Sequence, residues 1–408
     1  MRVKILFLIS GWCMILPSQT VIAEDTTSWK RWLVTQVEQH PSMVAAQETL
    51  NAAQSSAEGA RQPLYNPELE TELEREGSDD NYRLGLKQTV DWWDKRGALA
   101  QQGQFFAQSA EQVYEAMRQQ QYSETLTALV QWRNAQKKSI ITQQQETQLS
   151  QLLEVIQQRQ QTGDMSQVDA ALAYMALSQR LKSTADAEAD LRRAEANLTR
   201  LLPTWQQNMT LSSIPDSFWL WHSNKGAEQL SRQHPDVVAA DMRWQALKAN
   251  TVLAQRQQHA DPSFGVNVGR QNDENTVGLT FSIPLAVRNN FSAQARAASQ
   301  EALSAESSFR AIYLQRLHLI NGSQAVVSEY EKRYQRWQSL IKSHSTDSSD
   351  LLEKQWRTGD LSATDYIQIL NQQAEGRLAG IELEQEWKLT FIEYLTQSGV
   401  IAHVITSP

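Results

Sequence analysis

The order of motifs in the first half of this chain returns in the second half. His40-Pro41 is matched by His234-Pro235, and the turn at Thr162-Gly163 is matched by Thr358-Gly359. A pair of alternating segments stands between these motifs in both halves, and the offset stays at about 195 positions, which is the mark of a repeated unit. The chain is therefore predicted to be an internal duplication, in which each copy has the same order of elements.

The alternating segments, residues 67–91 and 262–284, are predicted to be β-hairpins. In the first, Leu69 and Leu73 alternate with four acids, which are Glu68, Glu70, Glu72 and Glu74. Successive side chains of a strand point to opposite faces, so each hairpin has an apolar and a polar face. Segments of roughly 10 residues with this pattern are typical of membrane-spanning β-barrel strands. Two surface hairpins of a soluble domain are the alternative that the pattern leaves open.

Long helical segments flank the hairpins. Gly and Pro are almost absent from residues 97 to 160, which predicts a helix of about 60 residues and about 90 Å. Residues 288–355 predict a second long helix, and residues 29–60 a shorter one with an inner start at His40-Pro41. Such lengths do not suit a small globular domain and indicate a coiled coil or a helical barrel.

Composition and the first residues exclude several classes of protein. The net charge of −8 and the pI of about 5.5 provide no basic surface for nucleic acid. Residues 1–23 have the charged end, apolar run and small-residue cleavage site of a signal peptide. The only cysteine, Cys13, lies within this segment, so the mature chain is expected to have no disulfide and no thiolate ligand.

Catalytic and metal-binding motifs are missing from the sequence. The seven histidines lack the paired spacing of metal sites, and no phosphate loop or nucleophile motif is present. We therefore expect no enzyme activity, no metal and no cofactor. His40 and His234, which precede proline at matched helix starts, are predicted to cap or pack there.

The number of strands predicts an oligomer. After Ala23 no apolar run approaches the roughly 20 residues of a spanning helix, so the chain can enter a membrane only as strands. Four strands cannot close a barrel, and an open edge in lipid leaves backbone N–H and C=O groups unpaired. Three chains would supply twelve strands, which is within the range of known transmembrane barrels.

This order of elements resembles the TolC family of outer-membrane factors over nearly all of the mature chain. Two short stretches are similar to the cobalt-zinc-cadmium efflux branch: Gln88-Thr89-Val90 leading to Lys95-Arg96-Gly97, and Ile283-Pro284-Leu285 leading to Arg288-Asn289-Asn290. The resemblance implies a mainly α fold with transmembrane β structure, assembled as a homotrimer. It also implies a 12-stranded barrel in outer-membrane lipid on a long periplasmic α-helical barrel, docked through a periplasmic adaptor protein to an inner-membrane pump.

The two helix–helix turns are the first candidate site. They contain Gly163, Asp164 and Asp169 in the first copy and Gly359, Asp360 and Asp365 in the second. The glycines permit the left-handed geometry that ends a helix, and Asp164 and Asp360 suit helix caps. The resemblance implies that these tips form the periplasmic entrance and dock the adaptor, with Asp365 as an acidic ring. Family members often have a second acid three positions later, where this chain has Gln368.

The hairpins are the second candidate site. Charge on a lipid face costs about 2–4 kcal/mol near mid-bilayer, so Glu68, Glu70, Glu72 and Glu74 are expected to line the channel lumen. A solvated face of a soluble hairpin is the alternative. Trp92 and Trp93, after the second strand, suit the membrane interface, although a core role for one of them is equally compatible with the sequence.

These expectations divide the chain into consecutive parts. After the signal peptide come a first repeat (24–202), an equatorial linker (203–226), a second repeat (227–397) and a C-terminal tail (398–408). The predicted function is a passive exit duct of a tripartite efflux system, exporting divalent metal cations. The alternatives are a duct for drugs or secreted polypeptides, and a soluble periplasmic coiled-coil scaffold.

Overall fold

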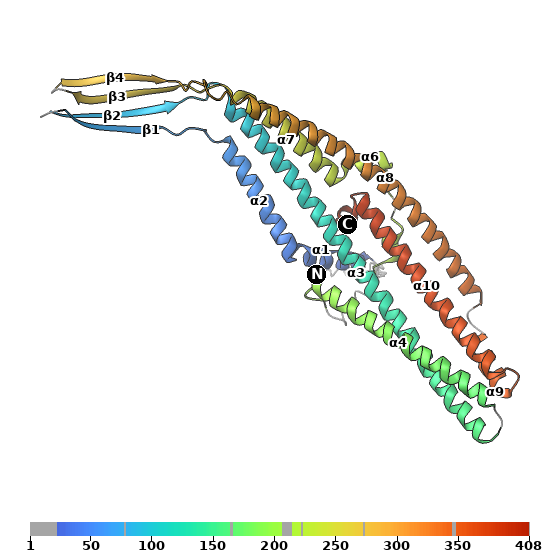
Figure 1. Ribbon diagram of the computed structural model, residues 1–408. Coiled ribbons are helices and arrows are strands. Elements are labelled where there is room, and N and C mark those ends of the chain that lie inside the picture. Colours follow the sequence, from blue (N-terminus) through green and yellow to red (C-terminus); the bar gives the residue numbers. More distant parts are fainter. Residues whose placement is uncertain are drawn as a thin grey trace, which may run out of the picture.

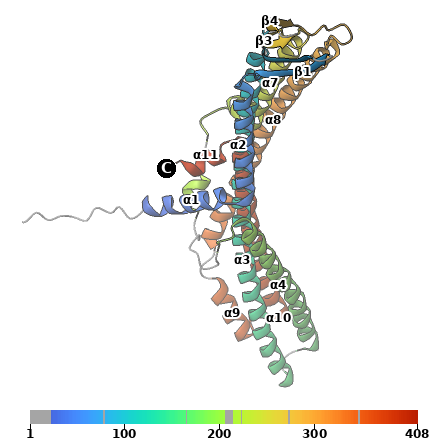
Figure 2. The same cartoon turned by 90° about the vertical axis from the view of Figure 1, so that its left-hand side faces the viewer.

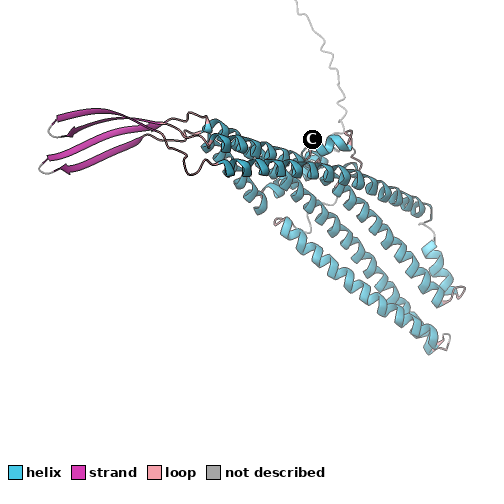
Figure 3. Ribbon diagram, turned by 45° about the horizontal axis from the view of Figure 1, so that its top comes forward, coloured by secondary structure: helices cyan, strands magenta, loops and turns pink. Residues whose placement is uncertain are grey.

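The chain is elongated, with all its strands at one end. The computed structural model describes residues 23–76, 79–163, 166–205, 214–221, 223–271, 274–344 and 348–407. A four-stranded sheet stands at one end, and long helices run from it to the other end (Figure 1). Figure 3 shows the same separation of strands from helices. The predicted signal peptide lies outside the described residues except for Ala23.

The first repeat gives helix, hairpin, long helix, turn and helix, as the sequence predicted. Its elements are α1 (Ala23–Glu38), α2 (Pro41–Arg61), β1 (Glu68–Glu76), β2 (Asp79–Thr89), α3 (Lys95–Gln161) and α4 (Gln167–Leu201). With 67 residues, α3 is roughly 100 Å long. His40 caps α2, because its side chain accepts a hydrogen bond from the backbone N–H of Ser42.

The second repeat follows the same order after a short helix, α5 (Asp216–Trp219). Its elements are α6 (Ala227–Gln233), α7 (Pro235–Arg256), β3 (Ser263–Gln271), β4 (Glu274–Ser282), α8 (Ser292–His344), α9 (Ser348–Thr358) and α10 (Ala363–Gln397), before the final α11 (Ile401–Thr406). His234 caps α7 as His40 caps α2, accepting from the backbone N–H of Asp236.

The single helix predicted over residues 288–355 is wrong. The helix begins later, at Ser292, because the side-chain oxygens of Asn289 and Asn290 accept from the N–H groups of Phe291 and Ser292 and form turns. It also ends at His344, and a separate helix starts at Ser348. Residues 345–347, between these two helices, lie outside the described residues.

The two hairpins form one antiparallel sheet in the order β1-β2-β3-β4. The pairing of β2 with β3 joins the two repeats, and Gly85 lies opposite Asn267 at its centre. Strands β1 and β4 are therefore the two outer strands of the sheet within this chain.

The main hydrophobic core lies midway along the helices. Short elements from different parts of the chain, α1, α5, α6 and α11, pack there against the middle of α3 and α8 and the C-terminal ends of α4 and α10. Tyr122, Leu126, Leu395 and Ile401 are fully buried in this core. Figure 2 shows α1 and α11 on one side of the long helices at this level.

Candidate functional site

The four glutamates of β1 share one face of the sheet with two cations of β2. Glu68 lies opposite Lys87, and Glu72 lies opposite Arg83. The Lys87 ammonium is 3.2 Å from carboxylate oxygens of both Glu68 and Glu70, and Arg83 is 2.6 Å from Glu72. The polar face predicted from the alternation is therefore present, but three of its four acids are ion-paired.

The opposite face of the same sheet is apolar and open. Leu73, Val277 and Leu279 are 84–86% exposed. The other large apolar side chains on this face are also exposed, and they are Leu69, Tyr82, Leu84, Leu86, Phe264, Val266, Val268 and Phe281. A contiguous apolar surface across four strands marks a site of contact with a membrane or with another protein.

A buried polar network joins the sheet to the helices. The ammonium of Lys95, at the start of α3, is 2.9 Å from Asp261 Oδ2 and donates to the His259 carbonyl at 2.7 Å. The Tyr65 hydroxyl donates to the same Asp261 oxygen at 2.7 Å. Tyr65 belongs to the first repeat and Asp261 to the second, so the network fixes the two strand-to-helix junctions to each other.

The two tryptophans at this junction differ in environment. Trp92 is 65% exposed, whereas the Trp93 ring stacks on His259 at 4.1 Å and its indole N–H donates to the Ala260 carbonyl. Trp93 thus packs against the junction while Trp92 projects from it. Their membrane role stays a prediction.

The helix–helix turns have the same cap in both repeats. Gly163 and Gly359 have φ of 80° and 86°, the left-handed conformation that glycine adopts at a helix end. Ser166 accepts from the Asp169 N–H and donates to its carboxylate at 2.9 Å, and Ser362 does the same for Asp365 at 2.7 Å. Both aspartates are therefore parts of a helix cap.

The remaining acids of the turns are placed as follows. The Thr358 hydroxyl donates to the carboxylate of Asp360. Asp164 lies outside the described residues. Asp365 is exposed and Asp169 is partly buried. The structure thus gives the two turns the same cap and leaves Asp365 the more accessible acid.

The two tips lie against each other. The Thr364 hydroxyl donates to Asp169 Oδ1 at 3.2 Å, which links the cap of one repeat to the cap of the other. The Arg159 guanidinium stands 5.3 Å from the Trp356 ring, and Trp356 stacks on Tyr366. The sequence analysis missed Arg159 and Trp356, although a tryptophan two residues before a helix-ending Thr-Gly was a signal of a packed tip.

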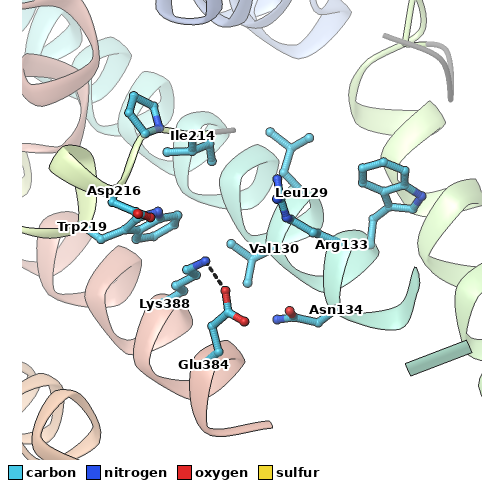
Figure 4. Close-up of a pocket in the computed structure, with 11 residues that line it drawn as sticks. Leu129, Val130, Arg133, Asn134, Ile214, Asp216, Trp219, Glu384 and Lys388 are labelled. Carbon is cyan, nitrogen blue, oxygen red and sulfur yellow. Dashed lines mark hydrogen bonds and ion pairs between the residues drawn. The ribbon is translucent and has the colours of Figure 1, made fainter. Parts of the chain in front are cut away.

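A polar pocket lies halfway along the helices, between α3, α5 and α10 (Figure 4). Its volume is about 290 Å³. Glu384 accepts from Lys137 of α3 at 2.5 Å and from Lys388 at 2.6 Å. Burial favours the neutral acid, but the two lysines outweigh it and hold the pKa of Glu384 below its usual value. The carboxylate therefore serves to join α3 to α10.

Two further properties bear on function. Within the residues that the structure describes, no three His, Cys, Asp or Glu side chains gather as a metal ion would need. No described helix is both long and apolar enough to cross a membrane.

The chain is similar to a family model and to several solved channel structures. Residues 32–204 match the family model described as outer membrane efflux protein. The CusC structure, described in terms of transmembrane channel formation, has a TM-score of 0.76 at 12% identity over 91% of this chain and 92% of that chain. The open-state MtrE outer membrane channel of Neisseria gonorrhoeae gives 0.76 at 12% identity, over 91% and 88% of the two chains. The CmeC outer membrane channel of Campylobacter jejuni gives 0.75 at 12% identity, over 92% and 86%. No curated protein sequence matches the chain.

The fold is thus that of outer-membrane channel subunits, with a sheet of strands at one end of a long helical body. Residues 32–204 of the first repeat match the outer membrane efflux protein family model, and this match and the fold support the predicted resemblance to TolC-type outer-membrane factors. The predicted mainly helical fold with a duplicated hairpin is confirmed as well. The cobalt-zinc-cadmium branch stays a prediction.

Proposed function

We propose that this chain is the outer-membrane exit duct of a tripartite efflux system, a passive channel with most of its length in the periplasm. The sheet carries this proposal. Its apolar face is exposed over all four strands and has charged residues only near the turns, whereas its polar face has charged residues along its length on β1 and β2. An apolar face of this extent suits the hydrocarbon of a membrane, and a polar face then turns toward an aqueous lumen.

The duct is a homotrimer. The outer strands β1 and β4 have no neighbour on their far sides within this chain, and lipid offers no partner for their backbone groups. Three copies supply twelve strands and close the barrel. Because each sheet continues into helices such as α3, the same three copies form a helical tube in the periplasm.

The helix tips form the periplasmic entrance and the docking surface for the adaptor protein, which connects the duct to an inner-membrane pump. This entrance contains Gly163, Asp164, Asp169, Gly359, Asp360 and Asp365. The exposed Asp365 is repeated three times around the trimer axis. Three carboxylates on one axis repel each other and attract cations, so the entrance prefers cationic cargo.

Divalent metal cations are the proposed cargo. The support is the similarity of two short stretches, which follow the second strand of each hairpin, to the cobalt-zinc-cadmium efflux branch. Asp169 is partly buried and is hydrogen-bonded to Ser166 and Thr364, whereas Asp365 is exposed and is hydrogen-bonded to Ser362, so Asp365 is the better candidate for contact with cations.

Membrane fractionation and bilayer recording test the channel. We expect the protein to stay with outer membranes after a carbonate wash, and the purified trimer to conduct in a planar bilayer. The variant Asp365→Asn should lower cation preference, while Ser362→Ala, which removes the capping hydroxyl and keeps the carboxylate, is the control. A protein that washes off the membrane, or a detergent-purified monomer without conductance, excludes the duct and favours the soluble scaffold.

Gene deletion tests the cargo. We expect a deletion strain to become sensitive to divalent metals rather than to hydrophobic drugs. Unchanged metal tolerance in a host without other ducts contradicts the metal assignment, and drug sensitivity alone would instead support a drug duct.

A further inference from the structure

The polar face of the sheet is built differently in its two halves. On β1 and β2 it holds Glu68, Glu70, Glu72 and Glu74 with the two cations Lys87 and Arg83, besides the acids next to the turn. On β3 and β4 the same face holds Glu274 beside the turn, and from there to Gly265 it holds uncharged residues, which are Gly265, Asn267, Gly269, Thr276, Gly278 and Thr280. Among the described residues of the sheet, the cations of this face are therefore both in the first hairpin.

Lys87 forms ion pairs with two acids at once and offsets the charge of one of them. Its ammonium is 3.2 Å from both Glu68 and Glu70, which are neighbours on one face of β1, and its side chain is only 24% exposed. Glutamates two positions apart on a strand are separated by about 7 Å, within the Debye length of about 8 Å at physiological salt. Without a cation between them, the negative potentials of the two carboxylates would add. The Lys87 ammonium is the cation that lies between them.

Arg83 does the same for the next acid. Its guanidinium is 2.6 Å from Glu72, directly opposite in the register. The described residues of β3 and β4 place no cation on this face that could replace either Lys87 or Arg83. Asn267, the largest side chain among them, is bonded to Thr280 at 3.0 Å.

We propose that Lys87 and Arg83 set the charge preference of the barrel lumen, by halving the negative charge of the four glutamates, which would otherwise attract multivalent cations more strongly. The proposal rests on the proposed function, because it requires the polar face to line a conducting pore. The proposal also concerns the cargo in the barrel. Multivalent cations pass the barrel without being bound there, and selection by charge occurs at the helix tips.

Block of single trimers by a trivalent cation tests the proposal. Hexaamminecobalt(III) has inert ligands, so it reports electrostatic attraction without direct coordination. Added on the strand side of a planar bilayer, it should block the Lys87→Gln, Arg83→Gln double variant at least about fivefold more tightly than the wild type at 0.1 M salt, because unpaired carboxylates attract it. Added on the helix-tip side, it should block both proteins alike.

Arg75→Gln is the matched control. Arg75 is also an arginine of the first hairpin in an ion pair, 3.4 Å from Asp80, but it lies on the opposite face of β1, near the turn. Its loss removes a positive charge from the outer face, so block on the strand side should stay at the wild-type value.

A second experiment removes the acids instead of the cations, and it predicts block by an anion. Glu68→Gln, Glu70→Gln leaves Lys87 without its carboxylates, so hexacyanoferrate(III), a trivalent anion, should now block from the strand side. If the Lys87→Gln, Arg83→Gln variant does not assemble, block of the Glu68→Gln, Glu70→Gln variant by hexacyanoferrate(III) decides whether the proposal holds. A wild-type trimer that does not conduct refutes the proposed function; conduction with the same block in all variants refutes the role of Lys87 and Arg83 alone.

Discussion

Gly380 shows how a single residue controls the packing of two long helices. A Cβ atom at this position would stand 1.9–2.4 Å from ring atoms of Trp337, far inside contact distance. One turn earlier, the Gly376 carbonyl accepts from the Trp337 indole N–H at 3.2 Å, and a Cβ atom on Gly376 would meet nothing within 4 Å. The Trp337 ring of α8 thus packs against α10 in a gap that is open only because Gly380 has no side chain.

We expect Gly380→Ala to lower the unfolding free energy by about 1–3 kcal/mol, since the Trp337 ring must move out of its gap. Gly376→Ala is the control and should be neutral or slightly stabilising, because alanine is the better helix former. Thermal melting in detergent, followed by tryptophan fluorescence, measures both. Equal melting temperatures would show that the ring is not held against Gly380.

His234 predicts a pH dependence of stability. The ring is 4% exposed. Burial, aided by the nearby Arg316 charge, lowers the pKa of His234 from 6.5 to about 4, against the opposing effect of Asp236. The unfolded chain then binds the proton more tightly than the folded one. The stabilisation is complete above pH 6.5 and is lost as the pH falls from 6.5 toward 4, by on the order of 3 kcal/mol.

The variant His234→Asn keeps a capping side chain and removes the titration, so its melting temperature should fall less between pH 7 and pH 4.5 than that of the wild type. His40→Asn is the matched variant at the equivalent cap, where the ring is only partly buried, and it should behave like the wild type. The same pH dependence in all three proteins would assign the effect to other groups.

At the scale of elements, local sequence patterns predicted most of the fold, but they did not predict the contacts between the two repeats. The alternation of Leu69 and Leu73 with glutamates fixes which face of β1 is polar, because strand side chains alternate strictly. The same alternation does not reveal that Lys87 lies between two of those acids, since that depends on the register of β1 with β2.

The candidate tip shows the same limit. Its glycines and Ser-x-x-Asp caps follow from the sequence, because helix ends have local chemistry. The bond from Thr364 to Asp169 joins residues in different repeats, and no local rule predicts it.

The junction between sheet and helices gives a prediction at this scale. Lys95 and Asp261 are 11% and 2% exposed at their side chains, so Asp261→Asn leaves an almost buried ammonium without its carboxylate. Breaking a buried pair on one side costs about 3–5 kcal/mol, and we expect a correspondingly lower melting temperature of the trimer. Arg256→Gln removes the neighbouring pair with Asp94, which is 68% exposed at the aspartate, and should cost at most about 1 kcal/mol.

At the scale of the whole molecule, the sheet would be a third of the barrel in the proposed trimer. The hydrogen-bonding edges of β1 and β4 are the two ends of a four-stranded sheet, and closure requires β4 of one copy to pair with β1 of the next. Cysteine cross-linking can test this cleanly, because the only cysteine, Cys13, lies in the predicted signal peptide.

We combine Thr71→Cys on β1 with a cysteine at Val277, Leu279 or Phe281 on β4. After oxidation, at least one of these three pairs should give covalent dimers and trimers and no larger species. These side chains share the apolar face, as bridging requires. Thr71→Cys with Leu84→Cys is the control, since these residues are paired within one chain and should bridge without a change in mass. Bridging in the control without interchain products from any of the three pairs would mean that the edges stay apart, and a sheet with open edges in lipid could not be the wall of a pore.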